Sequence, residues 1–273
     1  MPPYTGGKMA ISEKMLSLLR DPNDRGVLQV EGAALLNPRT KRRFPVVDDI
    51  PVLIEPGELG PQNRKFQRMY DWMASIYDLG QAVGNFLYRG KIARLRRHIA
   101  GMLELKPGRR CLYTSIGTGL DVPFLAEQVP LNQFDLIGLD LSMGMLRRCR
   151  KKLRGLAETS LLVQANAERL PFADRSFDVV LHIGGINFFD HPAVAVGEMV
   201  RVAKPGARIL IVDETKQVVT KNYQRNPLTR AYFKDAPTEF NPRAWIPAGV
   251  VDMSYEELWE GKGYCLSFRA PPE

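Results

Sequence analysis

The sequence predicts an α/β protein with a doubly wound, mostly parallel sheet, a C-terminal antiparallel hairpin and a small N-terminal β module. Three observations predict this class. Strand-like and helical stretches alternate from residue 110 onward. The first strand-like run is followed by a tight glycine turn, Gly117-Thr118-Gly119. Residues 1–58 instead hold short β-like runs separated by turn residues. Alternating strands and helices are typical of βαβ units, which build parallel sheets.

Three regions follow from this pattern. We assign 1–58 to the β module, 59–106 to a helical cap with apolar residues at helical spacing, and 107–273 to the core. Segment 55–63 is expected to be a linker, and 214–248, which has few periodic signals, a loop or lid. VVDMSYEEL and GYCLSFRA flank WEGKG and predict the closing hairpin. The expected core strands are 110–116, 134–139, 160–164, 177–183 and 207–213. The expected core helices are 120–128, 142–154 and 191–203.

Composition narrows the class of protein further. The hydrophobic and charged fractions, 45% and 25%, are those of a globular protein. No apolar run approaches the ~20 residues of a membrane span, and the N-terminus lacks the apolar core of a secretory signal. Three widely spaced cysteines argue against a disulfide framework and a cysteine zinc site, so we expect a cytoplasmic protein without a metal. The net charge of +8 favours nucleic acid or anionic partners, or serves solubility alone.

The glycine turn lies at the carboxyl edge of the predicted sheet, because the first strand ends at Ile116. In open α/β sheets ligands bind beyond this edge. Glycine permits a positive φ and lets a ligand approach the backbone. The second strand ends at Asp140, about 20 residues later, where a carboxylate accepts both hydroxyls of a ribose. Asp140 alternatively caps the helix that begins at Ser142. Together the two signals predict a nucleoside ligand.

Two more strand ends reach the same edge. Asn166 and Ala167 follow the third strand, where a side-chain amide can contact an adenine edge. His182 ends the fourth strand and is followed by IGGINFFD. We expect this loop to pass beneath the reactive end of a ligand whose ribose lies on Asp140.

With these residues in view, the run from about 108 to 213 resembles a class I S-adenosylmethionine-dependent methyltransferase. It is most similar to the branch that methylates quinones, sterols and related small molecules. The matching segments are SIGTGLD, GLDLSMGML, NAERLPFADRSFD and EMVRVAKPGARILIVDE. The resemblance implies a Rossmann-like fold, S-adenosylmethionine as the cofactor, and C- or O-methylation of a small apolar or aromatic molecule.

The same resemblance implies a cofactor site built from three parts. One lines the methionine portion, one holds the ribose and flanks the adenine, and one closes over the cofactor from the N-terminal helix. The methionine portion is lined by Ser115, Ile116, Gly117, Thr118 and Gly119. The ribose and adenine part consists of Asp140, Leu141, Met143, Asn166 and Ala167. Tyr77 closes over the cofactor, and Ile183 joins the site from the fourth strand.

A catalytic base is needed only where the acceptor carries a proton that it does not shed. The candidates near the expected site are His182, Tyr77 and Asn187. His182 stands at the ligand edge, and its ordinary pKa suits proton removal near neutrality. Its other interpretation is packing beside the cofactor without chemistry.

Two residues depart from the family pattern. Tyr113 stands where the family usually has Asp or Glu, and Ser115 stands where it has Gly. The acid helps to hold the amino group of the cofactor, so its loss either weakens binding or is compensated by another group. Asn166 replaces an Asp on the adenine side, a milder change because an amide oxygen still accepts a hydrogen bond.

The N-terminal module resembles a Trm112-like zinc ribbon that has lost its cysteines. Where Cys-Pro-x-Cys would form each knuckle, this chain has Asp21-Pro22-Asn23-Asp24 and Asn37-Pro38-Arg39-Thr40. Oxygen ligands on this scaffold make poor zinc sites. We therefore expect a metal-free relic; a hard cation on Asp21 and Asp24 is the alternative.

Three functions compete. The first is methylation of a small-molecule acceptor. The second is methylation of ribosomal or transfer RNA, favoured by the net charge and by the ribbon module. The third is a non-catalytic methyltransferase-like partner protein. The loss of the acid at Tyr113 favours this function, whereas the presence of Gly117, Gly119 and Asp140 argues against it.

Overall fold

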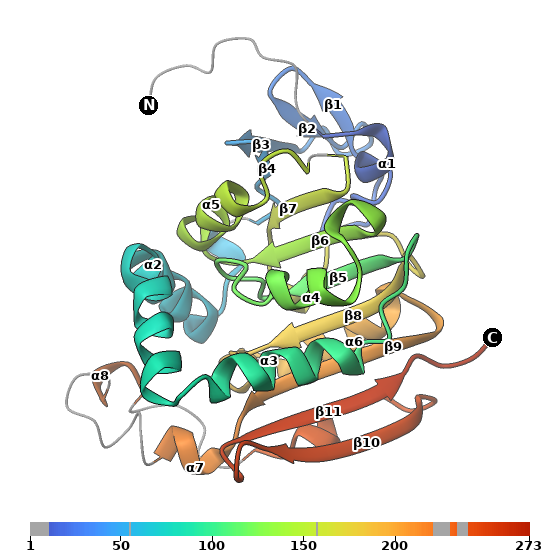
Figure 1. Cartoon of the computed structure of the whole chain (residues 1–273). Helices are drawn as coiled ribbons and strands as arrows, with labels where there is room; N and C mark the ends of the chain where they lie inside the picture. Colours follow the sequence, from blue (N-terminus) through green and yellow to red (C-terminus); the bar gives the residue numbers. More distant parts are fainter. Residues whose placement is uncertain (1–10, 55, 157, 221–229, 234–239) are drawn as a thin grey trace.

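The computed structural model describes residues 11–54, 56–156, 158–220, 230–233 and 240–273 (Figure 1). These residues form a seven-stranded sheet in which the four pairs among β5 to β9 are parallel. β11 lies antiparallel to β9, and β10 antiparallel to β11, which confirms the predicted hairpin. In spatial order the strands are β10 (Val251–Leu258), β11 (Gly263–Arg269), β9 (Ala203–Glu214), β8 (Phe177–Ile183), β5 (Arg110–Thr114), β6 (Asp135–Asp140) and β7 (Ser160–Gln164).

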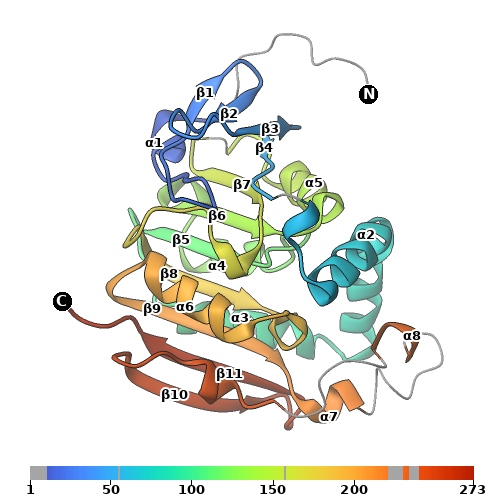
Figure 2. The same cartoon turned by 180° about the vertical axis from the view of Figure 1, so that it is seen from behind.

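Helices cover both faces of this sheet, as expected for a doubly wound fold (Figures 1 and 2). Buried residues alternate between the faces along each strand, so Leu112 contributes to one core cluster and Tyr113 to the other. One face is covered by α3 (Lys91–Met102), α4 (Val122–Gln128) and α5 (Met143–Lys152). The other is covered by α6 (Pro192–Val202) and the N-terminal module.

Two strand boundaries differ from the predicted ones by two residues or more. β5 ends at Thr114 rather than 116, because Ser115 adopts a positive φ of 62° and turns the chain. β9 begins at Ala203 rather than 207, because it pairs with Phe177 directly after α6. The 214–248 region holds α7 (Lys216–Val218), α8 (Arg230–Phe233) and η6 (Pro242–Trp245); its residues 221–229 and 234–239 lie outside the described part of the chain.

The N-terminal module is a four-stranded antiparallel sheet preceded by α1 (Glu13–Leu16). Its buried residues Leu35 and Leu53 belong to the same core cluster as the central strands. The Leu53 amide donates to the carbonyl oxygen of Gln164 on β7 (2.8 Å), so the module continues the β7 edge. Its strands are β1 (Gln29–Glu31), β2 (Ala34–Leu36), β3 (Arg43–Val47) and β4 (Ile50–Pro51).

The two knuckle-like turns of this module meet in a polar cluster. The amide nitrogen of Asn37 donates to Asp21 (2.8 Å) and to Asp24 (2.9 and 3.1 Å). Arg39 donates to Asp24 (2.7 Å), and Arg42 lies 3.3 Å from Asp21. Asp21 and Asn37 are fully buried. The guanidinium groups therefore neutralise the carboxylates that occupy the knuckle. Among the described residues, no three His, Cys, Asp or Glu side chains group so as to hold a metal ion.

Replacing Asn37 with alanine is expected to lower the free energy of unfolding by about 2 kcal/mol or more, because two carboxylates lose a shared buried donor. Chemical denaturation measures the loss. Asn132→Ala is the matched control, since Asn132 is exposed. A chelator should leave the unfolding midpoint of the unmodified protein unchanged. A chelator-induced drop, or equal stability of both variants, would contradict this account of the knuckle.

The helical cap consists of α2 (Pro61–Leu87) and α3, and η1 (Pro56–Glu58) precedes it. The expected linker thus contains a short helix and the start of α2. Gly60 at the start of α2 carries no capping side chain, and Asp190 supplies the cap by accepting from the Gln62 and Asn63 amides (3.1 and 3.0 Å). α2 stands at the carboxyl ends of the strands (Figure 1). Within the described ranges, no helix combines the length and apolarity that crossing a bilayer requires.

Candidate cofactor and acceptor site

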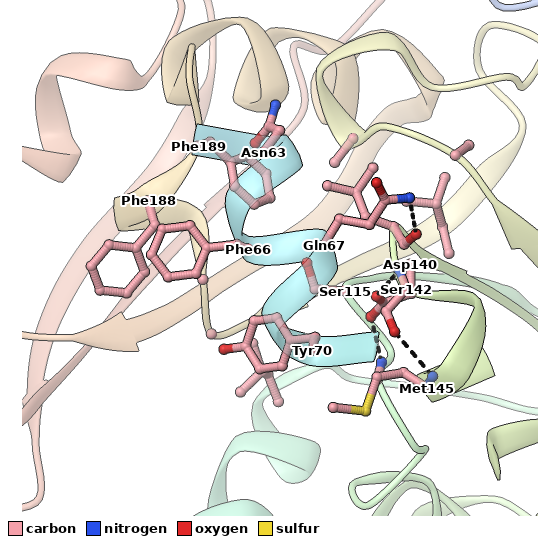
Figure 3. Close-up of a pocket in the computed structure, with 18 of the residues that line it drawn as sticks. Asn63, Phe66, Gln67, Tyr70, Ser115, Asp140, Ser142, Met145, Phe188 and Phe189 are labelled. Carbon is pink, nitrogen blue, oxygen red and sulfur yellow. Dashed lines mark hydrogen bonds between the residues drawn. The ribbon is translucent and has the colours of Figure 1, made fainter. Parts of the chain in front are cut away.

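A cavity lies between α2 and the carboxyl ends of β5, β6 and β8. One wall consists of α2 residues Asn63, Phe66, Gln67, Tyr70 and Tyr77. The opposite wall is formed by the turns that follow the three strands. Figure 3 shows Phe66 and Phe188 side by side at one end and Asp140, Ser142 and Met145 at the other. The cavity therefore has an aromatic end and an end that carries the carboxylate of Asp140.

The turn after β5 supports this cavity through two glycines with different tasks. Gly117 has a φ of 55°, and a Cβ built on it would meet no atom within 4 Å. Gly117 also lines the cavity, so its bare backbone is accessible to a ligand. Gly119 has a φ of 74°, but its Cβ would lie 2.8 Å from the sulfur of Cys149. Gly119 thus permits close packing on α5 and does not line the cavity. Ile116 does not line it either, because its side chain is buried in the core.

Asp140 ends β6 and joins two turns at the cavity. Its carboxylate accepts from the Gly117 amide (2.8 Å) and from the Ser142 amide (2.9 Å). Both expectations for Asp140 are compatible with this geometry, since it supports the start of α5 and also lines the cavity. Burial raises the pKa of Asp140 from 3.8 to about 6, although the backbone hydrogen bonds oppose the rise.

The far wall differs in part from the expected adenine-binding set. Of the residues expected to contact the cofactor, Leu141, Ala167 and Ile183 line the cavity. Met143 does not; Met145, two residues later and buried, takes that place. Asn166 does not line it, because its side-chain oxygen caps η3 (Ala167–Arg169) by accepting from the Glu168 amide (3.0 Å).

Two aspartates on α2 hold this helix against the cofactor-side turns. Asp71 accepts from the Ser142 hydroxyl (2.6 Å) and from the Gly144 amide (2.9 Å) at the start of α5. Asp78 accepts from the Thr118 hydroxyl (2.5 Å) and pairs with Lys152 (2.8 Å). Thr118 therefore serves to fix α2 and lies outside the cavity lining. Tyr77, adjacent to Asp78, lines the cavity.

His182 lies behind the cavity wall and not in it. Its side chain is fully buried, and its Nδ1 lies 3.0 Å from the Thr114 hydroxyl oxygen. The Thr114 hydroxyl donates to the Leu181 carbonyl, which leaves its oxygen to accept from Nδ1–H. Burial lowers the pKa of His182 to about 3, so the ring is neutral. The expected role as a base at the acceptor is corrected to packing, because the wall separates the ring from the cavity.

Asn187 is likewise a structural residue. Its amide nitrogen donates to the Glu214 carbonyl (2.7 Å), and its oxygen accepts from the Tyr264 hydroxyl (2.9 Å). Its backbone amide donates to Asp213 (3.0 Å). Since all these groups are engaged and Asn187 does not line the cavity, it holds η4 (Ile186–Phe188) in place. Of the three catalytic candidates, Tyr77 alone faces the cavity.

Tyr113, which replaces the family's acid, points away from the cavity into the α3 layer. Its hydroxyl donates to Asp121 (2.7 Å), and Asp121 pairs with Arg96 on α3 (3.0 Å). Both Tyr113 and Asp121 are buried. Asp121, at the start of α4, therefore holds the tyrosine and the arginine within the α3 layer.

We expect Tyr113→Phe to cost about 1 to 2 kcal/mol of unfolding free energy, because a buried bond to a carboxylate is lost. Cofactor affinity should change less than about twofold, since the ring does not line the cavity. Denaturation and calorimetric titration measure the two effects. Tyr255→Phe is the control, because the Tyr255 hydroxyl makes no hydrogen bond within the described part of the chain. A loss of affinity beyond tenfold would contradict the position of Tyr113 outside the cavity.

Several lining residues were not predicted from the sequence. Phe66, Gln67 and Tyr70 belong to this group, and so do Phe188 and Phe189. On a helix, the residues seven, eleven and fourteen positions before Tyr77 lie on the same face as Tyr77. This spacing could have predicted which α2 residues share the wall with Tyr77. Phe66 stacks on Phe188 with ring centroids 4.9 Å apart, and Phe233 on α8 contacts both.

Comparisons with known proteins agree with this geometry. The family model described as "Methyltransferase domain" matches residues 112–211. A demethylmenaquinone methyltransferase of Renibacterium salmoninarum is 29% identical over 213 residues, covering 70% of this chain and 85% of the relative. The ubiquinone/menaquinone biosynthesis C-methyltransferase UbiE of Ectopseudomonas mendocina is 31% identical over 189 residues, covering 67% and 70%. The crystal structure of the [4+2]-cyclase SpnF shares the fold, with a TM-score of 0.59, 16% identity and coverage of 79% and 98%.

The fold and the strand-end cavity define an S-adenosylmethionine-dependent methyltransferase of class I. Within this class the chain belongs to the family of UbiE-type methyltransferases. It is therefore an enzyme, and S-adenosylmethionine is its cofactor. The residues fit such a cofactor, since a Cβ-free backbone at Gly117 and the carboxylate of Asp140 face one cavity with the apolar Leu141, Met145 and Ala167.

Proposed function

We propose that the protein methylates a ring carbon of a small quinol-type acceptor. In this proposal, Asp140 holds the ribose of the cofactor, Gly117 its methionine end, and Leu141 and Met145 its adenine. The acceptor ring lies against Phe66 at the aromatic end of the cavity. The observation that carries the acceptor class is the stacked wall of Phe66 and Phe188, and the quinone-related names of the relatives support it.

When bound, S-adenosylmethionine supplies an electrophilic methyl group. The chain's own contribution is position and exclusion of water. α2 closes one side of the cavity and is held there by Asp71 and Asp78. Burial raises the pKa of Tyr77 to about 12, so its hydroxyl is protonated at neutral pH and acts as a hydrogen-bond donor.

The chemistry of the lining favours an acceptor that is itself a good nucleophile. Among the described lining residues there is no histidine and no lysine, and Asp140 is the one carboxylate. Asp140 already accepts two backbone hydrogen bonds. Because no side chain in this wall suits proton removal near neutrality, the acceptor needs an electron-rich carbon of the kind that a hydroquinone ring has.

The basic helix α5 argues against RNA as the acceptor. Arg147 pairs with Asp48 (2.8 Å), and Arg150 pairs with Asp49. Both aspartates belong to the N-terminal module, so Arg147 and Arg150 fix the module to the core.

We propose that residues 1–58 are a Trm112-like ribbon whose metal site is replaced by the Asn37 cluster. We also place the protein in the cytoplasm, which the burial of all three unpaired cysteines supports.

The test is transfer of an isotope-labelled methyl group from S-adenosylmethionine to a reduced, short-chain demethylnaphthoquinol, with a simple phenol and total RNA as competing acceptors. We expect label on the quinol ring carbon. Phe66→Ala should raise KM for the quinol about tenfold through lost aromatic contact and leave cofactor affinity unchanged. Phe86→Ala on the outer face of the same helix is the control. Label on RNA alone, or an unaltered KM for Phe66→Ala, would refute the proposal.

A further inference from the structure

The outer face of α2 carries an exposed apolar stripe. Trp72, Ile76, Leu79, Val83 and Phe86 follow one another at alternating spacings of four and three residues, which places them on one side of the helix. Between 50% and 81% of each side chain is exposed. α2 lies at the margin of the molecule, with α8 beside it (Figure 1). Contiguous apolar patches of this kind mark interaction surfaces.

Basic residues surround the stripe. Arg68 lies one helical turn before Trp72, and Arg89 follows the end of α2; both are exposed. Beside the middle of α2, Arg148 of α5 donates to the Ser75 carbonyl (2.7 Å), and exposed Lys151 lies one turn further along α5. Arg68, Arg89 and Lys151 have no carboxylate partner within the described part of the chain.

The two acidic groups on the same helix offset this charge only in part. Asp71 is bonded to Ser142 and Gly144, and Asp78 is paired with Lys152. The stripe therefore has an apolar centre and a cationic border. The net charge of +8 adds attraction toward any anionic surface.

We propose that the outer face of α2 docks on the surface of an anionic phospholipid bilayer. Apolar side chains of an amphipathic helix enter the boundary between headgroups and acyl chains, and the surrounding Lys and Arg pair with lipid phosphates. Trp72 and Phe86 are large apolar groups suited to that depth. Arg68 and Lys151 lie where headgroups would meet them.

A second copy of this chain fits the same face less well. In a parallel pairing of two α2 helices, Arg68 would meet Arg68. In an antiparallel pairing, Arg68 would meet Arg89 of the other copy. Either arrangement brings cations together without acids to compensate. Lipid phosphate supplies the opposite charge along the whole border.

The position of α2 links this surface to the site. The same helix presents Phe66, Tyr70 and Tyr77 to the cavity on its inner side. A docked α2 would therefore hold the aromatic end of the cavity next to the bilayer, where apolar acceptors dissolve. This consequence rests on the proposed function, whereas the docking itself rests on the surface alone.

The experiment is co-sedimentation of the full chain with phosphatidylcholine vesicles, with and without about 30% phosphatidylglycerol. We expect binding that requires the anionic lipid and weakens with added salt. The double variant Leu79→Glu and Phe86→Glu should bind at least tenfold more weakly. The control carries Val194→Glu and Met253→Glu, two apolar residues exposed elsewhere. Cofactor titration of every variant shows that the fold is intact.

Equal binding by the stripe and control variants would overturn the proposal. So would absence of vesicle binding together with a dimer that Phe86→Glu dissociates, since that result assigns the face to a second copy. The water-soluble quinol assay separates this proposal from the preceding one. Turnover without vesicle binding would refute only the docking proposal. Vesicle binding without turnover would refute only the proposed acceptor class.

Discussion

Asp140→Ala should weaken the binding of S-adenosylmethionine by about 100-fold or more. The variant removes the carboxylate that is proposed to accept both ribose hydroxyls, and each such charged hydrogen bond contributes about 1.5 kcal/mol or more. It also releases the Gly117 amide, whose position the carboxylate fixes (2.8 Å). Calorimetric titration of the purified variant gives the affinity directly.

The matched control is Asp135→Ala. Asp135 begins the strand that Asp140 ends, is buried, and pairs with Lys14 (2.5 Å). Its loss should lower stability without altering cofactor affinity, because it lies at the opposite edge of the sheet. If both variants weaken binding alike, the effect belongs to strand β6 and not to the carboxylate at the cavity.

The same residue predicts a pH dependence of binding. Because the pKa of Asp140 is raised to about 6, the folded protein retains this proton more strongly than the unfolded chain does. Ionising Asp140 therefore costs stability as the pH rises from its ordinary pKa of 3.8 through 6. The ribose needs the ionised form as acceptor, so affinity should rise with pH up to about 6 and then level off. Asp140→Asn should abolish this rise. Burial also raises the pKa of Asp213 to about 6, but Asp213 does not line the cavity.

Gly117→Val is expected to abolish measurable cofactor binding, a loss of at least about 100-fold. A side chain there would project into the open space of the cavity, against the methionine end of the ligand. The positive φ of 55° adds strain of about 1 kcal/mol for a β-branched residue. Titration with S-adenosylhomocysteine measures the affinity, and thermal unfolding reports the strain.

Gly119→Ala separates these two effects. Its φ of 74° brings similar strain, but its Cβ would strike Cys149 in the core and not a ligand. We therefore expect Gly119→Ala to lose stability and to keep cofactor affinity within a few-fold once folded. The assignment of Gly117 to the ligand would not survive if Gly117→Val bound the cofactor as tightly as Gly119→Ala.

Sequence periodicity was enough to locate the central sheet, its hairpin and the turn that carries Gly117. Each strand is a short apolar run bounded by turn residues, and local patterns of this kind are visible without partners. Asp140 was found for the same reason, since strand ends share one edge. Contacts between distant segments were not predictable. Asp190, which caps α2 from 128 positions away, is one example.

The errors in the site have two physical causes. His182 lies one residue before the end of β8, a strand that is covered on both faces, so a side chain at this edge of the sheet is as readily buried as exposed. Neither periodicity nor spacing distinguishes the two outcomes. Met145 lines the cavity where the resemblance implied Met143, although Ser142 caps α5 at the predicted start of the helix. Two residues apart on a helix, the two side chains point about 200° away from each other, and the resemblance did not fix which of them faces the ligand.

The most direct test of the account is a crystal structure of the protein with S-adenosylhomocysteine. We predict the ribose hydroxyls on the Asp140 carboxylate, the homocysteine portion against Gly117, and the sulfur facing the end of the cavity that Phe66 and Phe188 form. A ligand bound elsewhere, or a ribose held by other side chains with Asp140 turned away, would contradict the assignment of both the cofactor and the acceptor site.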